Sequence, residues 1–175
     1  MSRGLRLIPI ILLLWLVAGF AWRLIKPSDP AIRSQMVERT IPAFDLAPAI
    51  PTKPGLKSAD LADGKPRLLN VFASWCVPCV SEAAVLSDLR RRGVAIDAIA
   101  VRDTPEAIAA FLRRHGDPYE RLGSDPRSNT QISLGSSGVP ETFVVDGKGI
   151  IRHQHIGDVR PEDVAEIVAA YEAAR

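Results

Sequence analysis

The two cysteines, Cys76 and Cys79, are the side chains with the clearest capacity for chemistry. They stand three positions apart in the segment Trp75-Cys76-Val77-Pro78-Cys79. A disulfide between them would close a very small loop and would constrain the unfolded chain only slightly, which argues against a purely structural bond. The spacing instead favours a reversible dithiol that exchanges disulfides with other molecules.

Three other interpretations of this cysteine pair stay open. A zinc site would need further ligands, but the chain has no third cysteine, and His115, His153 and His155 are scattered along it. A covalent haem site needs a histidine directly after the second cysteine, where the chain has Val80. The third alternative is an inert pair of thiols. We expect neither a metal ion nor another cofactor.

The residues around the cysteines predict a strand that leads directly into a helix. Residues 67–73 are apolar and strand-like, whereas residues 80–92 carry apolar side chains with a helical period. A thiol at a helix N-terminus lies near unpaired N–H groups and the positive end of the helix dipole, which stabilise a thiolate. We therefore expect Cys76 to be the exposed nucleophile. Cys79, one turn further and more buried, would resolve the mixed disulfide.

The rest of the chain alternates strands and helices. Thr104 is suited to cap a helix that begins at Pro105, and Gly116 is suited to end it. Since a βαβ unit makes its strands parallel and a hairpin makes them antiparallel, we expect an α/β fold with a central mixed sheet flanked by helices. The further strands are expected over residues 41–46, 94–101, 141–146 and 150–156, and the further helices over residues 105–115 and 161–174.

The N-terminal residues have the composition of a membrane segment. Residues 7–22 contain no charged side chain, and a helix over residues 5–25 would be about 31 Å long, close to the hydrocarbon thickness of a bilayer. The basic residues before this run favour export of everything that follows. We predict an N-terminal transmembrane helix that serves as an uncleaved signal-anchor. A cleaved signal peptide is the alternative, because Gly19 and Ala21 are small.

These segments define the predicted organisation. Residues 1–26 form the anchor, the proline-rich residues 27–39 form a tether, and residues 40–175 form one domain. The chain carries 22 basic and 20 acidic residues, but four of the basic ones lie in residues 1–26, which contain no acid. The remaining residues carry 18 basic against 20 acidic side chains, so the domain has no charge that favours nucleic acid.

The order of elements around the Trp-Cys-x-x-Cys segment resembles the thioredoxin fold. Residues 137–142, Ser-Gly-Val-Pro-Glu-Thr, resemble the loop that carries a cis-proline in that fold. The resemblance implies a cis bond between Val139 and Pro140, in a loop beside the cysteines that presents the partner's backbone. The sequence alone leaves an ordinary trans proline open.

The more specific resemblance is to the CcmG or DsbE branch, the exported, membrane-anchored thiol:disulfide interchange proteins of cytochrome c maturation. It depends above all on Trp-Cys-Val-Pro-Cys together with Gly-Val-Pro-Glu-Thr-Phe at residues 138–143. The chain departs from the branch at Val80, at residues 100–104 and at Arg160, which stands where a better helix cap is common. The further matches are the anchor, Glu82 and residues 42–46, 64–66, 69–76, 111–112 and 115–119.

Two glutamates complete the predicted site. Asn70 stands where thioredoxins carry a buried aspartate, and Glu82 matches an acid of the branch. The helical spacing places Glu82 on the face of Cys79, where a partly buried carboxyl exchanges a proton with the thiol. Glu141 matches the second acid of the branch, and a solvated surface position is the alternative for both glutamates. The predicted catalytic residues are Cys76, Cys79 and Glu82, and the predicted partner-binding residues are Trp75, Val139, Pro140 and Glu141.

The resemblance implies a thiol:disulfide oxidoreductase held by a single pass in the bacterial inner membrane, with its domain in the periplasm. It implies that the client is the disulfide of apocytochrome c or a thiol carrier of that pathway. It also implies that electrons come from a membrane thiol-reductant transporter of the CcdA or DsbD type. The alternatives are a general exported thiol oxidase or isomerase, and a non-catalytic, anchored thioredoxin-like binding domain.

Overall fold

The computed structural model describes residues 8, 12–17, 19–20, 22 and 36–175. The chain divides into two units, residues 1–33 and 34–175. The described residues of the first unit are helical. Among the described residues, no helix combines the length and the apolar character needed to cross a bilayer. Most of the predicted anchor and tether lies outside the described residues.

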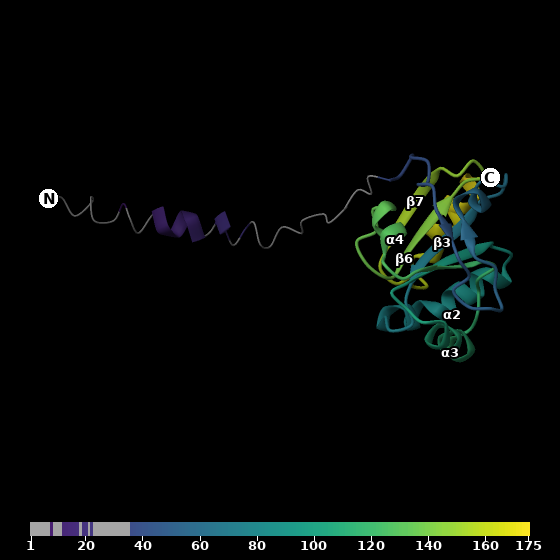
Figure 1. Ribbon diagram of the computed structural model, residues 1–175. Coiled ribbons are helices and arrows are strands. Elements are labelled where there is room, and N and C mark those ends of the chain that lie inside the picture. Colours follow the sequence, from purple (N-terminus) through teal and green to yellow (C-terminus); the bar gives the residue numbers. More distant parts are fainter. Residues whose placement is uncertain (1–7, 9–11, 18, 21, 23–35) are drawn as a thin grey trace. The chain divides into compact units, whose positions relative to one another are not determined.

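A five-stranded mixed sheet with the strand order β5-β4-β3-β6-β7 is the centre of the second unit (Figure 1). Its parallel part and its antiparallel hairpin confirm the predicted mixed sheet, and its fully buried central strand is β3. The parallel strands are β3 (Arg67–Phe72), β4 (Ile96–Val101) and β5 (Leu122–Asp125), and the antiparallel strands are β6 (Glu141–Val145) and β7 (Ile151–Ile156).

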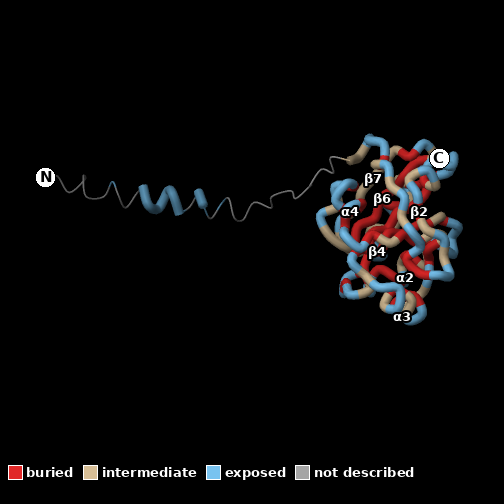
Figure 2. Tube along the Cα trace, in the orientation of Figure 1, coloured by how far each residue is buried: buried red, intermediate tan, exposed pale blue. Residues whose placement is uncertain are grey.

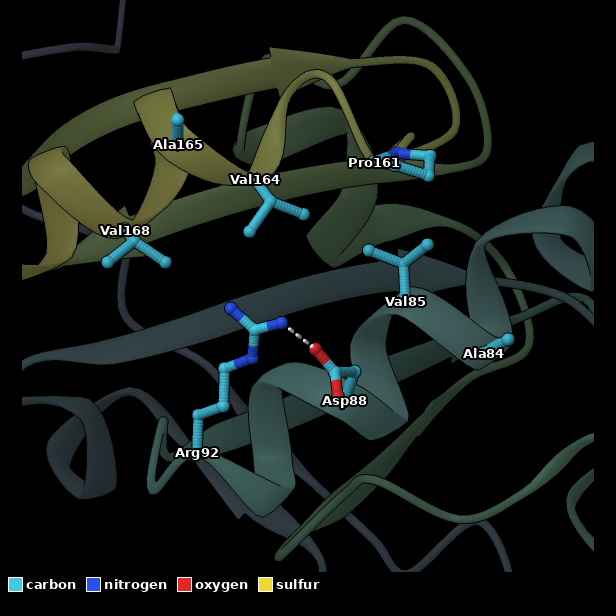
Figure 3. A pocket seen from close by; sticks show the side chains of 8 residues that line it. All are labelled: Ala84, Val85, Asp88, Arg92, Pro161, Val164, Ala165 and Val168. Atoms are coloured by element: carbon cyan, nitrogen blue, oxygen red, sulfur yellow. Dashed lines mark ion pairs between the residues drawn. The ribbon is translucent and has the colours of Figure 1, made fainter.

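Helices flank this sheet, and the buried stretches of the chain lie mainly in the interior of the second unit, along the strands of the sheet (Figure 2). Helix α5 packs against β6 and β7, and α2 contacts α3. Side chains of α2 also face the start of α5 across a mostly apolar surface groove, which has the Asp88–Arg92 ion pair on one wall (Figure 3). The helices are α2 (Val77–Arg91), α3 (Pro105–His115), α4 (Asn129–Ser133) and α5 (Val164–Ala173).

The predicted bounds of α3 are confirmed, since the Thr104 hydroxyl accepts a hydrogen bond from the Ala107 N–H and the helix ends before Gly116. The predicted start of α5 is wrong. Residues 161–163 form a turn, in which the Arg160 N–H donates to the Asp163 carboxylate at 2.9 Å. Asp163 therefore stands at the N-cap of α5, three residues later than expected.

Several short helices and strands of the structure were not predicted from the sequence. The strand β5 has the sequence Leu-Gly-Ser-Asp, which is typical of a turn, and only its pairing with β4 makes it a strand. Gly123 in this strand faces Leu46 so closely that a Cβ atom would lie 2.8 Å from the Leu46 Cβ. The predicted strand over residues 41–46 forms only at its end, as β1 (Asp45–Leu46). The other elements missed are β2 (Leu56–Lys57), η1 (Ser58–Leu61) and α4.

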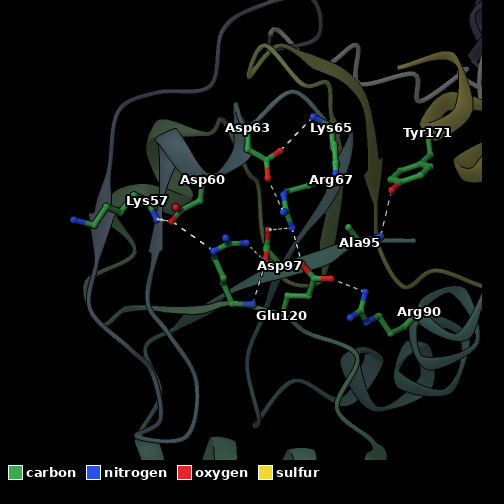
Figure 4. Close-up of polar contacts among 11 residues, drawn as sticks. Lys57, Asp60, Asp63, Lys65, Arg67, Arg90, Ala95, Asp97, Glu120 and Tyr171 are labelled. Atoms are coloured by element: carbon green, nitrogen blue, oxygen red, sulfur yellow. Dashed lines mark hydrogen bonds and ion pairs between the residues drawn. The ribbon is translucent and has the colours of Figure 1, made fainter. Parts of the chain in front are cut away.

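A buried ion-pair network links the start of β3 to neighbouring elements (Figure 4). The Arg67 guanidinium lies 2.8 Å from the Asp63 and Glu120 carboxylates and 3.2 Å from that of Asp97. Asp97 is fully buried, and this burial raises the pKa of its carboxyl. A buried carboxylate is tolerated here because Arg67 compensates its charge.

Candidate active site

The two cysteines form a disulfide at the N-terminus of α2. Cys76 is the N-cap residue, and its sulfur accepts a hydrogen bond from the Cys79 N–H at 3.2 Å. Cys76 is 4% exposed and Cys79 is 1% exposed, so the expectation of an exposed Cys76 is wrong for the oxidised form. The helix begins at Val77 rather than at residue 80, which places Cys76 directly against the unpaired N–H groups of the first turn.

The loop before Cys76 is held by residues that follow β4. The Asp103 carboxylate accepts hydrogen bonds from the Ser74 N–H at 2.6 Å and from the Ser74 hydroxyl at 2.8 Å. The Trp75 indole donates to the Arg102 carbonyl at 3.1 Å, and the Arg102 guanidinium lies 5.8 Å from the centre of the indole ring. Residues 100–104, one of the segments in which this chain departs from the CcmG/DsbE branch, therefore support the redox centre. This support could have been predicted from the position of Arg102 and Asp103 directly after β4, since the parallel strands β3 and β4 end at the same edge of the sheet.

Trp75 is 53% exposed beside the disulfide, as a partner-binding residue must be. The Val139–Pro140 bond is cis, as the resemblance implied. Val139 packs against the same core cluster that contains both cysteines. Partner binding by Trp75, Val139 and Pro140 stays a prediction.

Glu141 lies inside the protein, and the alternative of a surface strand residue is wrong because it is 1% exposed. Its Oε1 atom accepts hydrogen bonds from the Ser137 N–H and hydroxyl, both at 2.7 Å, and from the Gly138 N–H at 3.2 Å. Its Oε2 atom accepts a hydrogen bond from the Gln154 amide at 2.8 Å. The carboxylate is thus engaged in holding the cis-proline loop, and direct contact with a partner stays a prediction.

Glu82 is also 1% exposed, so the alternative of a solvated surface glutamate is wrong. Burial raises the pKa of Glu82 to about 7, although hydrogen bonds from the Val159 N–H at 3.1 Å and the Asn70 amide at 3.0 Å act in the opposite direction. Glu82 is one helical turn from Cys79 on α2, and both side chains are buried. A carboxyl of this pKa can both accept and release a proton near neutral pH.

Asn70 connects Glu82 to two residues that the sequence analysis did not include in the site. Its amide nitrogen also donates to the Thr142 hydroxyl at 3.1 Å, and its carbonyl oxygen accepts from the Tyr119 hydroxyl at 2.8 Å. Thr142 is the direct partner of Asn70 in the β3–β6 register. The match of residues 115–119 to the branch was the only signal for Tyr119.

The arrangement brings the predicted residues together from three elements. The cysteines and Glu82 lie at the start of α2, and Pro140 and Glu141 stand at the start of β6. Asn70 lies on β3 beside β6, and its amide nitrogen donates both to Glu82 at 3.0 Å and to the Glu141 carbonyl at 3.5 Å. Within the described part of the chain, no group of three His, Cys, Asp or Glu side chains is placed to hold a metal ion. The Cys76–Cys79 pair and the buried Glu82 one turn behind it are suited to dithiol exchange, with a carboxyl close to the resolving cysteine.

Comparisons with known proteins agree with this chemistry. Residues 36–171 match the family described as Redoxin. The thiol:disulfide interchange protein HelX of Rhodobacter capsulatus is 38% identical over 94% of this chain and 92% of the relative. The thiol:disulfide interchange protein DsbE of Pseudomonas fluorescens is 37% identical over 99% of this chain and 96% of the relative.

The chain belongs to the DsbE/HelX thiol:disulfide interchange proteins of the Redoxin family. A solved structure from Chlorobium tepidum, described as a thiol:disulfide interchange protein DsbE, superimposes with a TM-score of 0.58 and 27% identity. It covers 77% of this chain, and 94% of its own length is matched. As a member of this family, the chain is a thiol:disulfide oxidoreductase, with Cys76 and Cys79 as its CxxC pair. This membership excludes the alternative of a non-catalytic binding domain.

Proposed function

We propose that this DsbE/HelX family member is a periplasmic reductant of cytochrome c maturation. In this proposal, residues 1–26 hold it to the bacterial inner membrane. Its reduced dithiol opens the disulfide of apocytochrome c, or of a thiol carrier in that pathway, before haem is attached. The observation that carries the proposal is the Cys76–Cys79 pair at the start of α2 with the buried Glu82 one turn behind it. Similarity to DsbE over 99% of the chain supports the client and the location.

The reaction begins with the Cys76 thiolate, which the N–H groups at the start of α2 stabilise. Its sulfur attacks one sulfur of the client disulfide; the client S–S bond breaks, and a mixed disulfide forms. The client sulfur that leaves takes up a proton. The two partner-facing residues Trp75 and Val139 hold the client backbone during this step.

Cys79 and Glu82 resolve the mixed disulfide. The Glu82 carboxylate accepts the thiol proton of Cys79, and the resulting thiolate attacks the Cys76 sulfur. The mixed disulfide breaks, the second client sulfur leaves as a thiol, and the Cys76–Cys79 disulfide forms. The client has gained two electrons from the protein and two protons, one of them the Cys79 proton that Glu82 accepted and the other from solvent. The oxidised protein recovers the two electrons from a dithiol donor, a membrane thiol-reductant transporter of the CcdA or DsbD type.

A trapping experiment tests the client. A Cys79→Ser variant cannot resolve the mixed disulfide, so it should accumulate a covalent adduct with an oxidised Cys-x-x-Cys-His peptide. A Cys76→Ser variant is the matched control and should form none. Absence of an adduct with the Cys79→Ser variant contradicts the exchange mechanism. Equal trapping of unrelated disulfide peptides would favour the general oxidase or isomerase.

The reduction potential of the Cys76–Cys79 pair tests the direction of exchange. A reductant needs a potential well below that of a strong periplasmic oxidase, which is about −120 mV. Equilibration of the full chain with glutathione redox buffers gives this value. A potential near that of the oxidase contradicts the proposed direction.

A further inference from the structure

Tyr119 ends the segment of residues 115–119 and is held rigidly inside the domain. Its ring stacks on Phe72 with 5.1 Å between the ring centroids. Its backbone carbonyl accepts a hydrogen bond from the Lys53 ammonium, which also pairs with the Asp117 carboxylate at 2.8 Å. The side chain thus has one fixed direction, and its hydroxyl points to Asn70 at 2.8 Å. Nothing in the exchange mechanism above uses this hydroxyl.

The Asn70 side chain has two different ends, and the Tyr119 hydroxyl and the Glu141 backbone carbonyl favour the same one toward Glu82. An amide carries an acceptor oxygen and a donor nitrogen. Burial raises the pKa of Tyr119 well above its ordinary value, so the hydroxyl keeps its proton and remains a donor. With Tyr119 donating to the amide oxygen at 2.8 Å, the amide nitrogen is directed at Glu82 and at the Thr142 hydroxyl. The amide nitrogen also donates to the Glu141 backbone carbonyl, but at 3.5 Å, so Tyr119 makes the shorter of the two contacts that fix the orientation.

We propose that Tyr119 is a positioning residue of the redox centre, which acts through Asn70. Its hydroxyl locks the Asn70 amide so that an N–H donor faces the Glu82 carboxylate and keeps that carboxylate ready to accept the Cys79 proton. The inference deepens the proposed function, because it depends on the role of Glu82 as the proton acceptor. Without the lock, the amide can turn its oxygen toward Glu82, which favours the protonated acid.

The groups that face Glu82 come from α2, from the loop after β7 and, through Asn70, from β3 and Tyr119. Cys79 lies one turn before Glu82 on α2. Asp158, which follows β7, is the nearby negative charge. Tyr119 acts on Glu82 through its hydrogen bond to Asn70. The Val159 N–H holds the second carboxylate oxygen at 3.1 Å. In the oxidised protein Cys79 is in the disulfide and does not titrate, so the titration of Glu82 is then observed without it.

The test compares the chain's two tyrosines. Tyr119→Phe removes the hydroxyl that contacts Asn70, and Tyr171→Phe removes a hydroxyl that only accepts from the Ala95 N–H at 3.3 Å (Figure 4). Carboxyl carbon NMR of the oxidised full chain in detergent follows the Glu82 titration. Tyr119→Phe should raise its midpoint by about one pH unit, a tenfold increase in proton affinity. Tyr171→Phe should leave the midpoint unchanged. An unchanged midpoint in folded Tyr119→Phe overturns the proposal.

A second measurement keeps the Tyr119 hydroxyl in place. Fluorotyrosine incorporated into the Tyr171→Phe chain labels Tyr119 alone, since the chain has 2 tyrosines. Its fluorine resonance should move with the Glu82 titration, and Glu82→Gln should abolish that movement. A resonance that ignores the titration overturns the proposal. These NMR results are separate from the role of Glu82 in exchange: that role fails if Glu82→Gln resolves a Cys76 mixed disulfide as fast as the wild type.

Discussion

Replacing Glu82 with glutamine should change how the stability of the oxidised protein depends on pH. Burial raises the pKa of Glu82 from its ordinary value of 4.5 to about 7 in the folded protein. Between these two pH values the folded protein binds one proton more than the unfolded chain. Its stability therefore falls as the pH rises through this window, and the contribution is constant below 4.5 and above 7.

The size of the effect follows from the width of this window. A change of one unit in pKa corresponds to about 1.4 kcal/mol, so the raised pKa of Glu82 removes about 3 kcal/mol of unfolding free energy at high pH. Glu82 is 1% exposed, so solvent screening does not reduce this contribution appreciably. Glutamine has nearly the same shape but carries no titrating group, and Glu82→Gln should lose this part of the pH dependence.

Urea unfolding of the oxidised full chain at a series of pH values between 4 and 8 measures the effect. The stability of the wild type relative to Glu82→Gln should fall by about 3 kcal/mol between pH 4.5 and pH 8. Other titrating groups are shared by both proteins and cancel in the difference. The matched control is Glu106→Gln on the exposed side of α3, which should follow the wild type. Parallel curves for the wild type and Glu82→Gln would refute the reasoning.

Three further substitutions test the supports of the site. Asp103→Ala removes the acceptor that holds the loop before the first cysteine, and should slow alkylation of reduced Cys76 by about tenfold in stopped-flow measurements; an unchanged rate contradicts this support. Arg67→Met removes the nearer cation of the buried Asp97 and leaves only Arg121, 3.8 Å from its carboxylate, so it should cost about 3–5 kcal/mol in urea unfolding. Asp97→Asn should restore part of this loss, and full stability of the single variant contradicts the ion-pair argument. Glu141→Ala frees the cis-proline loop and should slow reaction with a disulfide peptide severalfold, whereas alkylation of Cys76 by iodoacetamide should keep its rate; equal slowing of both reactions would point to a general loss of structure.

The fold could be predicted where a signal is local. The cap at Thr104 and the proline after it define α3, because both act through the backbone of the same turn. The start of α5 could not be predicted so well, since Arg160 and Asp163 form a turn that delays the helix. The strand β5 was missed because its residues favour a turn, and only pairing with β4 outweighs that preference.

The sequence by itself determined the reaction centre. Cys76 and Cys79 are the chain's only cysteines, and their spacing at the start of a helix already favours dithiol exchange, because both the small loop and the helix N-terminus are local properties. Only the tertiary structure decided the environment of Glu82. Its buried carboxylate accepts hydrogen bonds from Asn70 on β3 and from Val159 in the loop after β7, and its surroundings extend to Tyr119. These contacts join residues far apart in the chain, and a raised pKa arises from such packing and not from spacing along one helix.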